Sequence, residues 1–312
     1  MTTRTWADHD ELEFDVVDVF TTTAFAGNGL AVVYGAESLT TQQLQALARE
    51  FNLSETAFPV PPGDVGQDVA VDADADYGLR IFTPETELPF AGHPSVGAAW
   101  ALCRRGLLTP GRRGQLCRAG LVELETAGPD DVVWLTGRPP VVGGEIDPAG
   151  PLAAVGLGAI DQVGVTPVVA GAGLDFSYLF VRPGSIARAV PDLQQLRRLR
   201  THGPELGGVV IVGWHDGTAR VRVFTDDIGA TEDPATGSAA LGLGAVLVHA
   251  GLLAGDGTST FTVRQGIEIG RPSTLYGEVR AQAGVPVQCR VGGTVVPVSR
   301  GTIAVPPRAT SS

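Results

Sequence analysis

Three ionisable side chains, Glu55, His93 and Asp233, stand where a loop or helix gives way to a new element. Carboxyl and imidazole groups are the usual general acids and bases of enzymes, and they work best when their pKa lies near the working pH. The chain has no phosphate-binding loop, dinucleotide-binding loop, nucleophile elbow or paired-histidine zinc motif. We therefore expect proton transfer that uses no cofactor and no metal ion.

The sequence around Glu55 leaves two interpretations open. Residues 38–52 have apolar side chains at helical spacing, and residues 53–58 enter a strand, so that Glu55 lies at the junction. A carboxylate half-buried there would have the raised pKa that a general base or acid requires near neutral pH. Alternatively, Glu55 is an exposed residue on an edge strand, and the pattern alone favours this second interpretation.

His93 lies at the start of an expected helix over 92–105, just after a strand that ends in Arg-x-Phe-Thr. Pro94 suits a first helical turn because proline lacks the amide hydrogen that would be unpaired there. The free amides near Gly92 could bind a substrate carboxylate or phosphate. The pattern does not decide whether His93 is an acid–base group or an ordinary polar loop residue.

The stretch from residue 80 to 100 has a second copy over residues 222–240. Both copies read Arg-x-Phe-Thr, a polar loop, then Pro-x-x-Gly and an alanine-rich helix, which indicates an internal duplication. A length of 312 residues fits two domains of about 150 residues each. We expect the helix starts headed by His93 and Asp233 to face each other across a cleft.

Two further residues could contact a ligand. Asn28 stands between two glycines, which favours a turn with positive φ or a loop whose amides face a ligand. Arg271 begins an Arg-Pro-Ser turn that could aim its guanidinium at a carboxylate. Glu85 and Glu87, in the loop before His93, are expected to be solvated.

Composition excludes several classes of protein. A formal net charge of −12 argues against nucleic-acid binding, which depends on phosphate neutralisation by Lys and Arg. No apolar run approaches the roughly 20 residues of a membrane span, and residues 1–13 have no apolar signal core, so we expect a cytoplasmic protein. The three cysteines are odd in number and lack metal-ligand spacing, which predicts neither a disulfide framework nor a metal site.

Six motifs stand in order along the chain. They are Phe25-Ala26-Gly27-Asn28, Asn52-Leu53-Ser54-Glu55-Thr56, Ile81-Phe82-Thr83-Pro84, Leu88-Pro89-Phe90-Ala91-Gly92-His93-Pro94, Glu232-Asp233-Pro234-Ala235-Thr236-Gly237-Ser238-Ala239 and Gly270-Arg271-Pro272-Ser273. Together they resemble the phenazine-biosynthesis PhzF-like isomerase family. The resemblance implies an α+β fold like that of diaminopimelate epimerase, with two pseudo-symmetric lobes, each a mixed sheet wrapped around a central helix. It implies an active site between the lobes.

The resulting domain expectation is an N-terminal lobe over 14–137, completed by a C-terminal strand near 295–305. The C-terminal lobe would cover 138–294, with flexible tails at 1–13 and 306–312.

The resemblance also implies roles for individual residues. Glu55 would take a proton from one carbon of the substrate, and the proton would be delivered to another carbon in a cofactor-free allylic isomerisation. His93 and Asp233 would orient a substrate amine or hydroxyl, or relay protons. The residues expected to bind substrate are Asn28, Gly92, Gly237, Ser238 and Arg271.

The chain departs from the family pattern at Gly29, where proline usually follows Phe-Ala-Gly-Asn, and this loosens the first loop. Related epimerases carry a cysteine pair between the lobes. Gly92 and Asp233 look like the corresponding positions, so two-thiol racemisation is not expected.

The expected function is proton movement on a small unsaturated amino acid or cyclic carboxylic acid in secondary metabolism, by a homodimer. Two alternatives remain. One is an epimerase that acts at an α-carbon, with Glu55 and Asp233 on opposite faces of the substrate. The other is a non-catalytic binding member of the same fold.

Overall fold

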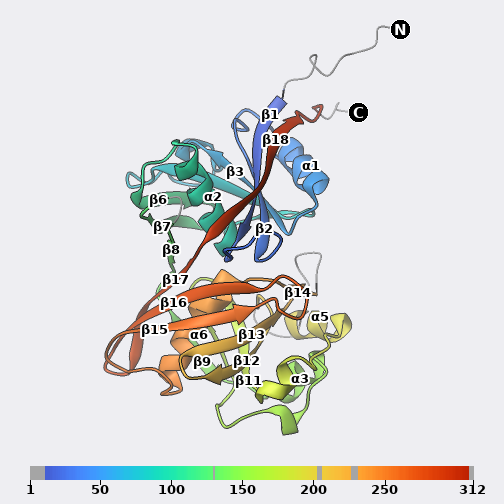
Figure 1. Ribbon diagram of the computed structural model, residues 1–312, viewed down its shortest axis with the longest axis vertical. Helices are drawn as coiled ribbons and strands as arrows, with labels where there is room; N and C mark the ends of the chain where they lie inside the picture. The colour runs from blue at the N-terminus through green and yellow to red at the C-terminus, as the bar shows by residue number, and fades with distance from the viewer. Residues whose placement is uncertain (1–10, 129–130, 202–205, 226–230, 309–312) are drawn as a thin grey trace.

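A computed structural model describes residues 11–128, 131–201, 206–225 and 231–308 of the chain. The described residues form two lobes stacked along the long axis of the molecule (Figure 1). The lobes are joined where β8 (Val133–Thr136) pairs antiparallel with β17 (Val285–Gly293). None of the described helices is both long enough and apolar enough to cross a membrane.

The N-terminal lobe is a mixed sheet around α2, with α1 on its outer side (Figure 1). Its first strand pairs antiparallel with β18, the last strand of the chain. In chain order, the elements of this lobe are β1 (Glu11–Val19), β2 (Asn28–Val33), α1 (Thr41–Phe51), β3 (Glu55–Val60), β4 (Tyr77–Phe82), β5 (Glu87–Leu88), α2 (Gly92–Arg104), β6 (Gly111–Cys117), β7 (Gly120–Thr126), β8 and the returning β18 (Val295–Ala304).

The C-terminal lobe repeats this plan around α6. Three shorter helices lie outside its sheet (Figure 1). Its elements are β9 (Val141–Glu145), α3 (Ala149–Ala154), β10 (Val168–Gly171), β11 (Asp175–Phe180), α4 (Pro183–Ile186), α5 (Leu193–Thr201), β12 (Val209–His215), β13 (Thr218–Phe224), β14 (Glu232–Asp233), α6 (Gly237–His249), β15 (Gly257–Gln265), β16 (Ser273–Gln282) and β17.

Strand pairing shows the duplication directly. In the first lobe β1 is antiparallel to β2, β2 is parallel to β3, and β4 is parallel to β6. In the second lobe β10 is antiparallel to β11, β11 is parallel to β12, and β13 is parallel to β15. The expected pair of pseudo-symmetric lobes is therefore confirmed.

The last strand, β18, returns to pair with β1 in the first lobe. We therefore propose the lobe boundaries 14–137 and 138–294, with 295–305 completing the first lobe. β1 begins at Glu11, so the last three residues of the expected N-terminal tail belong to a strand. Pro306 also contacts the body of the protein, because its carbonyl accepts a hydrogen bond from Gln43 Nε2 at 2.6 Å.

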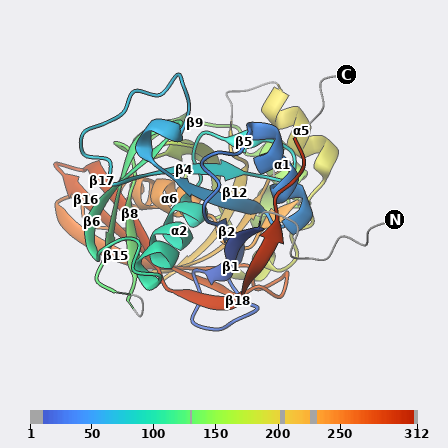
Figure 2. The same cartoon turned by 90° about the horizontal axis from the view of Figure 1, so that it is seen from above.

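The two central helices are buried because small residues let the sheets close around them. Seen from above, α2 and α6 lie near the centre of the molecule with strands around them (Figure 2). Residues 92–102 of α2 are all buried, as are most residues of α6, and helices that are apolar on every side belong in a core. Close approach is clearest at Gly242, where a β-carbon would lie 2.3 Å from Tyr178 Oη.

The end of α1 sets the position of Glu55. The helix starts with a capping box in which Thr40 Oγ1 accepts from the Gln43 amide and Gln43 Oε1 accepts from the Thr40 amide. It ends at Phe51 and is capped by Asn52, which adopts the left-handed conformation with φ of 48°. The chain then turns directly into β3, whose first residue is Glu55.

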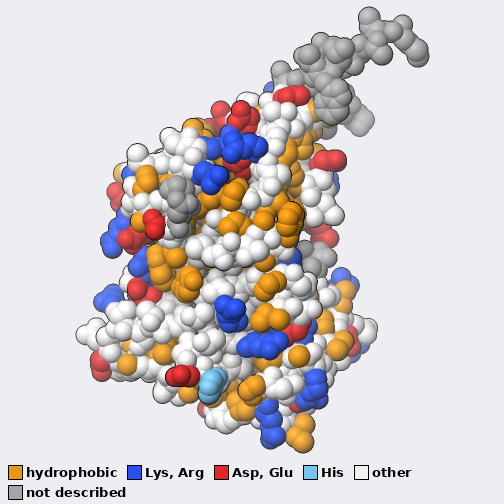
Figure 3. Space-filling view, in the orientation of Figure 1, with side chains coloured by type: hydrophobic (Ala, Val, Ile, Leu, Met, Phe, Trp, Pro, Cys, Tyr) orange, Lys and Arg blue, Asp and Glu red, His pale blue; other side chains and the backbone are white. Residues whose placement is uncertain are grey.

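Charges of both signs occur over both lobes on the face drawn in Figure 3. The excess negative charge of the chain is therefore not gathered into one patch on that face.

We expect Gly242→Ala to lower the free energy of unfolding by about 1–3 kcal/mol, because the added methyl overpacks α6 against Tyr178. Gly184→Ala is the matched control, since no atom lies within 4 Å of the position that its β-carbon would take. Urea unfolding measures both variants. Equal stability of the two would contradict the close packing described for α6.

Candidate active site

Glu55 lies in the interior of the sheet. It begins β3, which is bounded by β2 on one side and β4 on the other. The residue is 6% exposed, so the interpretation as an exposed edge-strand glutamate is wrong. Its Oε2 is buried without a hydrogen-bond partner and lies 3.4 Å from His93 Nε2, which also lacks one.

Burial sets the protonation of Glu55. Burial and, to a smaller extent, the nearby charge of Asp233 raise the pKa of this carboxyl to about 8, although the Ser54 hydroxyl acts in the opposite direction. Glu55 is therefore mostly protonated at pH 7, and it reaches its basic form close to physiological pH. A carboxyl group with such a pKa can both accept and donate a proton.

His93, the second residue of α2, is electrically neutral in this setting. Burial lowers the pKa of its imidazole to about 3, and the Gly29 carbonyl acts weakly in the opposite direction. The ring is 4% exposed. The contact between His93 and Glu55 is thus a contact between a neutral ring and a carboxyl group, and not an ion pair.

Asp233, the last residue of β14, is held by hydrogen bonds to both of its carboxylate oxygens. Oδ1 accepts from Asn28 Nδ2 at 2.9 Å, and Oδ2 accepts from Thr236 Oγ1 at 2.5 Å. Burial raises its pKa to about 6, while these hydrogen bonds act in the opposite direction. Asp233 is therefore mostly ionised at pH 7, in contrast to Glu55.

Asn28 joins these groups across the two lobes. It begins β2 and is 1% exposed, with Oδ1 accepting from Ser54 Oγ at 2.9 Å. Its Nδ2 lies 2.9 Å from Asp233 Oδ1 and 3.2 Å from His93 Nδ1. The residue expected to bind substrate is thus placed among the three proposed catalytic side chains.

Gly92, Gly237 and Ser238 meet where the N-termini of the two central helices come together. A β-carbon on Gly92 would lie 3.4 Å from both Gly237 Cα and the Ser238 amide nitrogen. The free amides and positive dipole ends of α2 and α6 are therefore concentrated at one place, which favours a negatively charged ligand group. Their proximity supports the expected carboxylate site.

Strand register corrects the pairing of the two copies. Phe82 pairs with Glu87 as Phe224 pairs with Glu232, so the counterpart of Asp233 is Leu88. Gly92 therefore corresponds to Gly237, and His93 to Ser238. Asp233, expected to head the second helix, lies instead in β14, four residues before α6 begins at Gly237.

The guanidinium of Arg271 contacts a carboxylate that belongs to the protein itself. Its Nη2 contacts Asp18 Oδ1 at 2.5 Å and its Nε donates to the Gly27 carbonyl at 2.9 Å. Asp18 is 3% exposed and also accepts from the Phe25 amide. The geometry favours a link between the lobes over the expected substrate contact. Gly29 lies beside this link, since its β-carbon would be 3.5 Å from Arg271 Nη2.

The residues that hold Asp233 in place are not among those expected from the sequence. Gln265, 1% exposed, donates from Nε2 to the Asp233 carbonyl at 2.8 Å and to Thr236 Oγ1 at 2.9 Å. Next to Asp233, Glu232 forms a buried ion pair with Arg222 at 2.9 and 2.6 Å. The repeated arginine of the Arg-x-Phe-Thr motif was a signal for this pair, whereas nothing in the sequence distinguished Gln265.

The first copy has the equivalent ion pair. Arg80 contacts Glu87 through two hydrogen bonds of 2.8 and 2.9 Å. The expectation that Glu87 is a solvated loop acid is therefore wrong, because it sits in β5 with a side chain that is 11% exposed. Glu85 is exposed, as expected.

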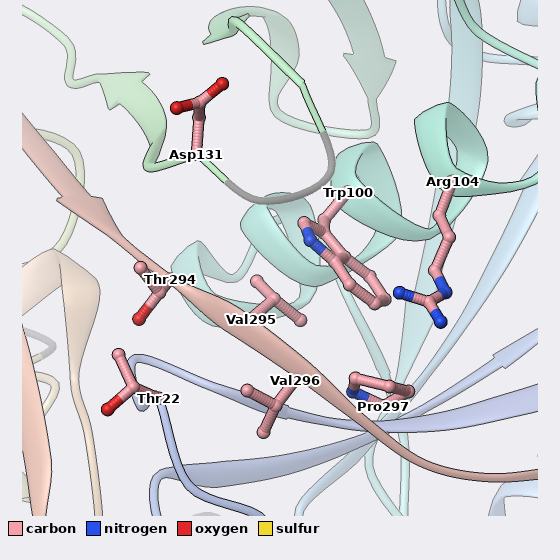
Figure 4. A pocket seen from close by; sticks show the side chains of 8 residues that line it. All are labelled: Thr22, Trp100, Arg104, Asp131, Thr294, Val295, Val296 and Pro297. Carbon is pink, nitrogen blue, oxygen red and sulfur yellow. The ribbon is translucent and has the colours of Figure 1, made fainter.

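The proposed catalytic side chains lie outside the surface pocket shown in Figure 4. That pocket lies beside β18 and is lined by Trp100, Arg104 and Pro297, among others. Glu55, His93 and Asp233 are each at most 8% exposed, so the structure describes the site with its lobes closed over it. Within the described ranges, no group of three or more His, Cys, Asp or Glu residues could hold a metal ion.

Comparison with known proteins places the chain in a family. The model of the phenazine biosynthesis-like protein family matches residues 17–301. An uncharacterized isomerase of Mesorhizobium japonicum is 34% identical over 92% of this chain and 97% of its own. The trans-2,3-dihydro-3-hydroxyanthranilate isomerase of Pseudomonas chlororaphis is 30% identical over 93% of this chain and 98% of its own.

A solved structure agrees on the fold. The PhzF-family protein of Bacillus anthracis superposes with a TM-score of 0.82 at 21% identity, covering 95% of this chain and all of that one. Fold and relatives together define an isomerase that acts on a small molecule. The chain belongs to the phenazine biosynthesis-like, or PhzF, family, as its motifs suggested.

The free energy of unfolding should depend on pH through the protonation of Glu55. Its pKa is about 8 in the folded protein and near 4.5 in the unfolded chain, so folding favours the protonated form. The associated stability is fully present below pH 4.5 and is lost as the pH rises through 8. We expect Glu55→Gln to be more stable, relative to the wild type, at pH 9 than at pH 5. The difference in free energy of unfolding should grow by roughly 1.4 kcal/mol for each unit by which folding raises the pKa.

Urea unfolding at the two pH values measures this difference, with the exposed Glu85→Gln as the matched control. A difference between Glu55→Gln and the wild type that does not change with pH would contradict the raised pKa.

Proposed function

We propose that the protein is a cofactor-independent isomerase that moves a proton between two carbons of a small unsaturated amino acid or cyclic carboxylic acid. Glu55 serves first as base and then as acid. The observation that carries this proposal is the buried Oε2 of Glu55, which has no hydrogen-bond partner and belongs to a carboxyl group of pKa about 8.

In the proposed reaction, ionised Glu55 takes a proton from a carbon next to a double bond. The electron pair of the broken C–H bond shifts the double bond by one position, and protonated Glu55 returns the proton to the far carbon. One C–H bond breaks and one forms, so no oxidant or reductant is needed. The proton held by Glu55 exchanges with solvent hydrogen before it is delivered, so that the far carbon receives hydrogen from the solvent.

Charge complementarity supports an acidic substrate with an amine or hydroxyl group. Its carboxylate would lie against the amides near Gly92, Gly237 and Ser238, where the two helix N-termini meet. Ionised Asp233 and neutral His93 would orient the amine or hydroxyl. The relative in Pseudomonas chlororaphis isomerises a hydroxylated dihydro-anthranilate, which has this set of groups.

The hydrogen bonds of Asp233 favour one base over two. Both of its oxygens already accept hydrogen bonds from within the protein, whereas Glu55 has one oxygen free. The hydrogen bonds of Asp233 hold its carboxylate in place and favour its ionised form, which suits a group that orients the substrate better than a second base. The proposal also includes a cytoplasmic homodimer in secondary metabolism, which the family resemblance favours.

Turnover of trans-2,3-dihydro-3-hydroxyanthranilate and related cyclic amino acids in heavy water tests the proposal. We expect deuterium at the newly protonated carbon, and a loss of about 100-fold or more in rate for Glu55→Gln, because a general base is removed. Glu85→Gln should keep full activity.

Mass spectrometry and NMR of the product measure both outcomes. Full activity of Glu55→Gln would contradict the role of Glu55, and a product that differs only by inversion at the α-carbon would support an epimerase instead.

A further inference from the structure

The buried side chain of Gln265 is bonded entirely to the segment between β14 and α6. Its Oε1 accepts from the Thr236 amide at 3.2 Å. Its Nε2 donates to the Asp233 carbonyl at 2.8 Å and to Thr236 Oγ1 at 2.9 Å. These two acceptors take both hydrogens of the amide nitrogen, so that nothing of the NH₂ group is left for a ligand.

The orientation of the Gln265 amide follows from these partners. The backbone N–H of Thr236 can only donate a hydrogen bond, and the carbonyl of Asp233 can only accept one. A flipped amide would place its NH₂ group against the N–H and its oxygen against the carbonyl. The amide oxygen therefore faces the Thr236 backbone, and the NH₂ group faces the Asp233 carbonyl and the Thr236 hydroxyl.

This orientation determines where the single hydroxyl hydrogen of Thr236 points. Gln265 Nε2 donates to Thr236 Oγ1 and cannot accept from it. The acceptor within reach of the hydroxyl is Asp233 Oδ2, at 2.5 Å, so the hydrogen lies on that bond. A hydrogen bond donated to a carboxylate favours its ionised form, and this one lowers the pKa of Asp233 against the effect of burial.

The first lobe forms the same strand–loop–helix corner without such a network. Strand β5 ends as β14 does, β6 ends as β15 does, and one residue caps the start of α2 as Thr236 caps that of α6. The register of the paired strands agrees with these equivalences. The three counterparts of Asp233, Thr236 and Gln265 are Leu88, Ala91 and Cys117. The fold therefore does not require the network, which points to a role in the site.

We propose that Gln265 is a positioning residue that directs the hydroxyl hydrogen of Thr236 onto Asp233, so that this carboxylate stays an acceptor for the amine or hydroxyl group of a substrate. The inference rests on the proposed function for its catalytic meaning. Asn28 Nδ2 and the Ala235 amide also favour the ionised carboxylate, which has about four acceptor sites and thus keeps the capacity to bind a ligand donor. A protonated Asp233 would present a hydrogen to that donor instead.

Titration of Asp233 tests the network without any substrate. In protein with ¹³C-labelled aspartate, carbon NMR follows the Asp233 carboxyl, whose signal is identified by its absence from Asp233→Asn. We expect a pKa of about 6 in the wild type and of about 7 or above in Thr236→Val, which loses a hydrogen bond to the ionised form. Thr236→Ser keeps the hydroxyl and should titrate as the wild type does. An unchanged pKa in Thr236→Val, or a raised one in Thr236→Ser, would overturn the proposal.

A double-mutant cycle separates action through Thr236 from a direct effect of Gln265. Gln265→Leu should raise the pKa of Asp233 in the wild-type background but change it little in Thr236→Val, where no hydroxyl remains to be directed. Poorer solvation beside the leucine would raise the pKa equally in both backgrounds, and that result would overturn the proposal. Gln43→Leu is the matched control, because it removes a buried amide at the start of α1 and should leave the titration of Asp233 unchanged.

Kinetics connect the network to the substrate. In the wild type, KM for a substrate with an amine or hydroxyl group should rise as the pH falls through about 6 and Asp233 becomes protonated. In Thr236→Val this rise should begin about one pH unit higher, with kcat at pH 8 within about 3-fold of the wild type. A lower kcat with an unchanged KM profile would contradict the proposed role. If the wild type moved no deuterium on any substrate, the proposed function would fail, whereas the titration would still decide the role of Gln265.

Discussion

The burial of two carboxyl groups close together is the constraint on which the site depends. Glu55 comes from the first lobe and Asp233 from the second, and among the described residues neither forms an ion pair with an arginine. Burial raises the pKa of both groups, and the charge of Asp233 raises that of Glu55 further. Hydrogen bonds from Asn28 and Thr236 favour the ionised form of Asp233, and Glu55 takes the higher pKa.

The duplicated fold brings these groups together and holds them. Each lobe surrounds a central helix, and the two helices meet at Gly92 and Gly237, where an added β-carbon would already touch the backbone of the facing helix. The buried Arg222–Glu232 ion pair anchors β14 next to Asp233, with Arg222 Nη1 also bonded to the Ile186 and Ala189 carbonyls. Such pairs contribute little net stability, and we interpret this one as fixing the position of the strand.

Much of the fold could be predicted from local patterns. The repeated Arg-x-Phe-Thr and Pro-x-x-Gly signals indicated the duplication, and apolar side chains at helical spacing indicated the helix that ends just before Glu55. The burial of Glu55 could not be predicted in this way, because residues 53–58 do not reveal which strands flank β3 or that a second lobe covers its end. The contact between Asn28 and Asp233 joins residues 205 positions apart, and only the folded chain brings them together.

The most direct test of the account is the titration of Glu55 itself. Infrared difference spectra of the free protein between pH 6 and pH 10 detect the carbonyl stretch of a protonated carboxyl group, and Glu55→Gln identifies the band that belongs to Glu55. The account predicts a band that is lost with an apparent pKa near 8 in the wild type and is absent from the variant. Titration of Glu55 near its ordinary pKa of 4.5, with no such band at pH 6, would contradict it.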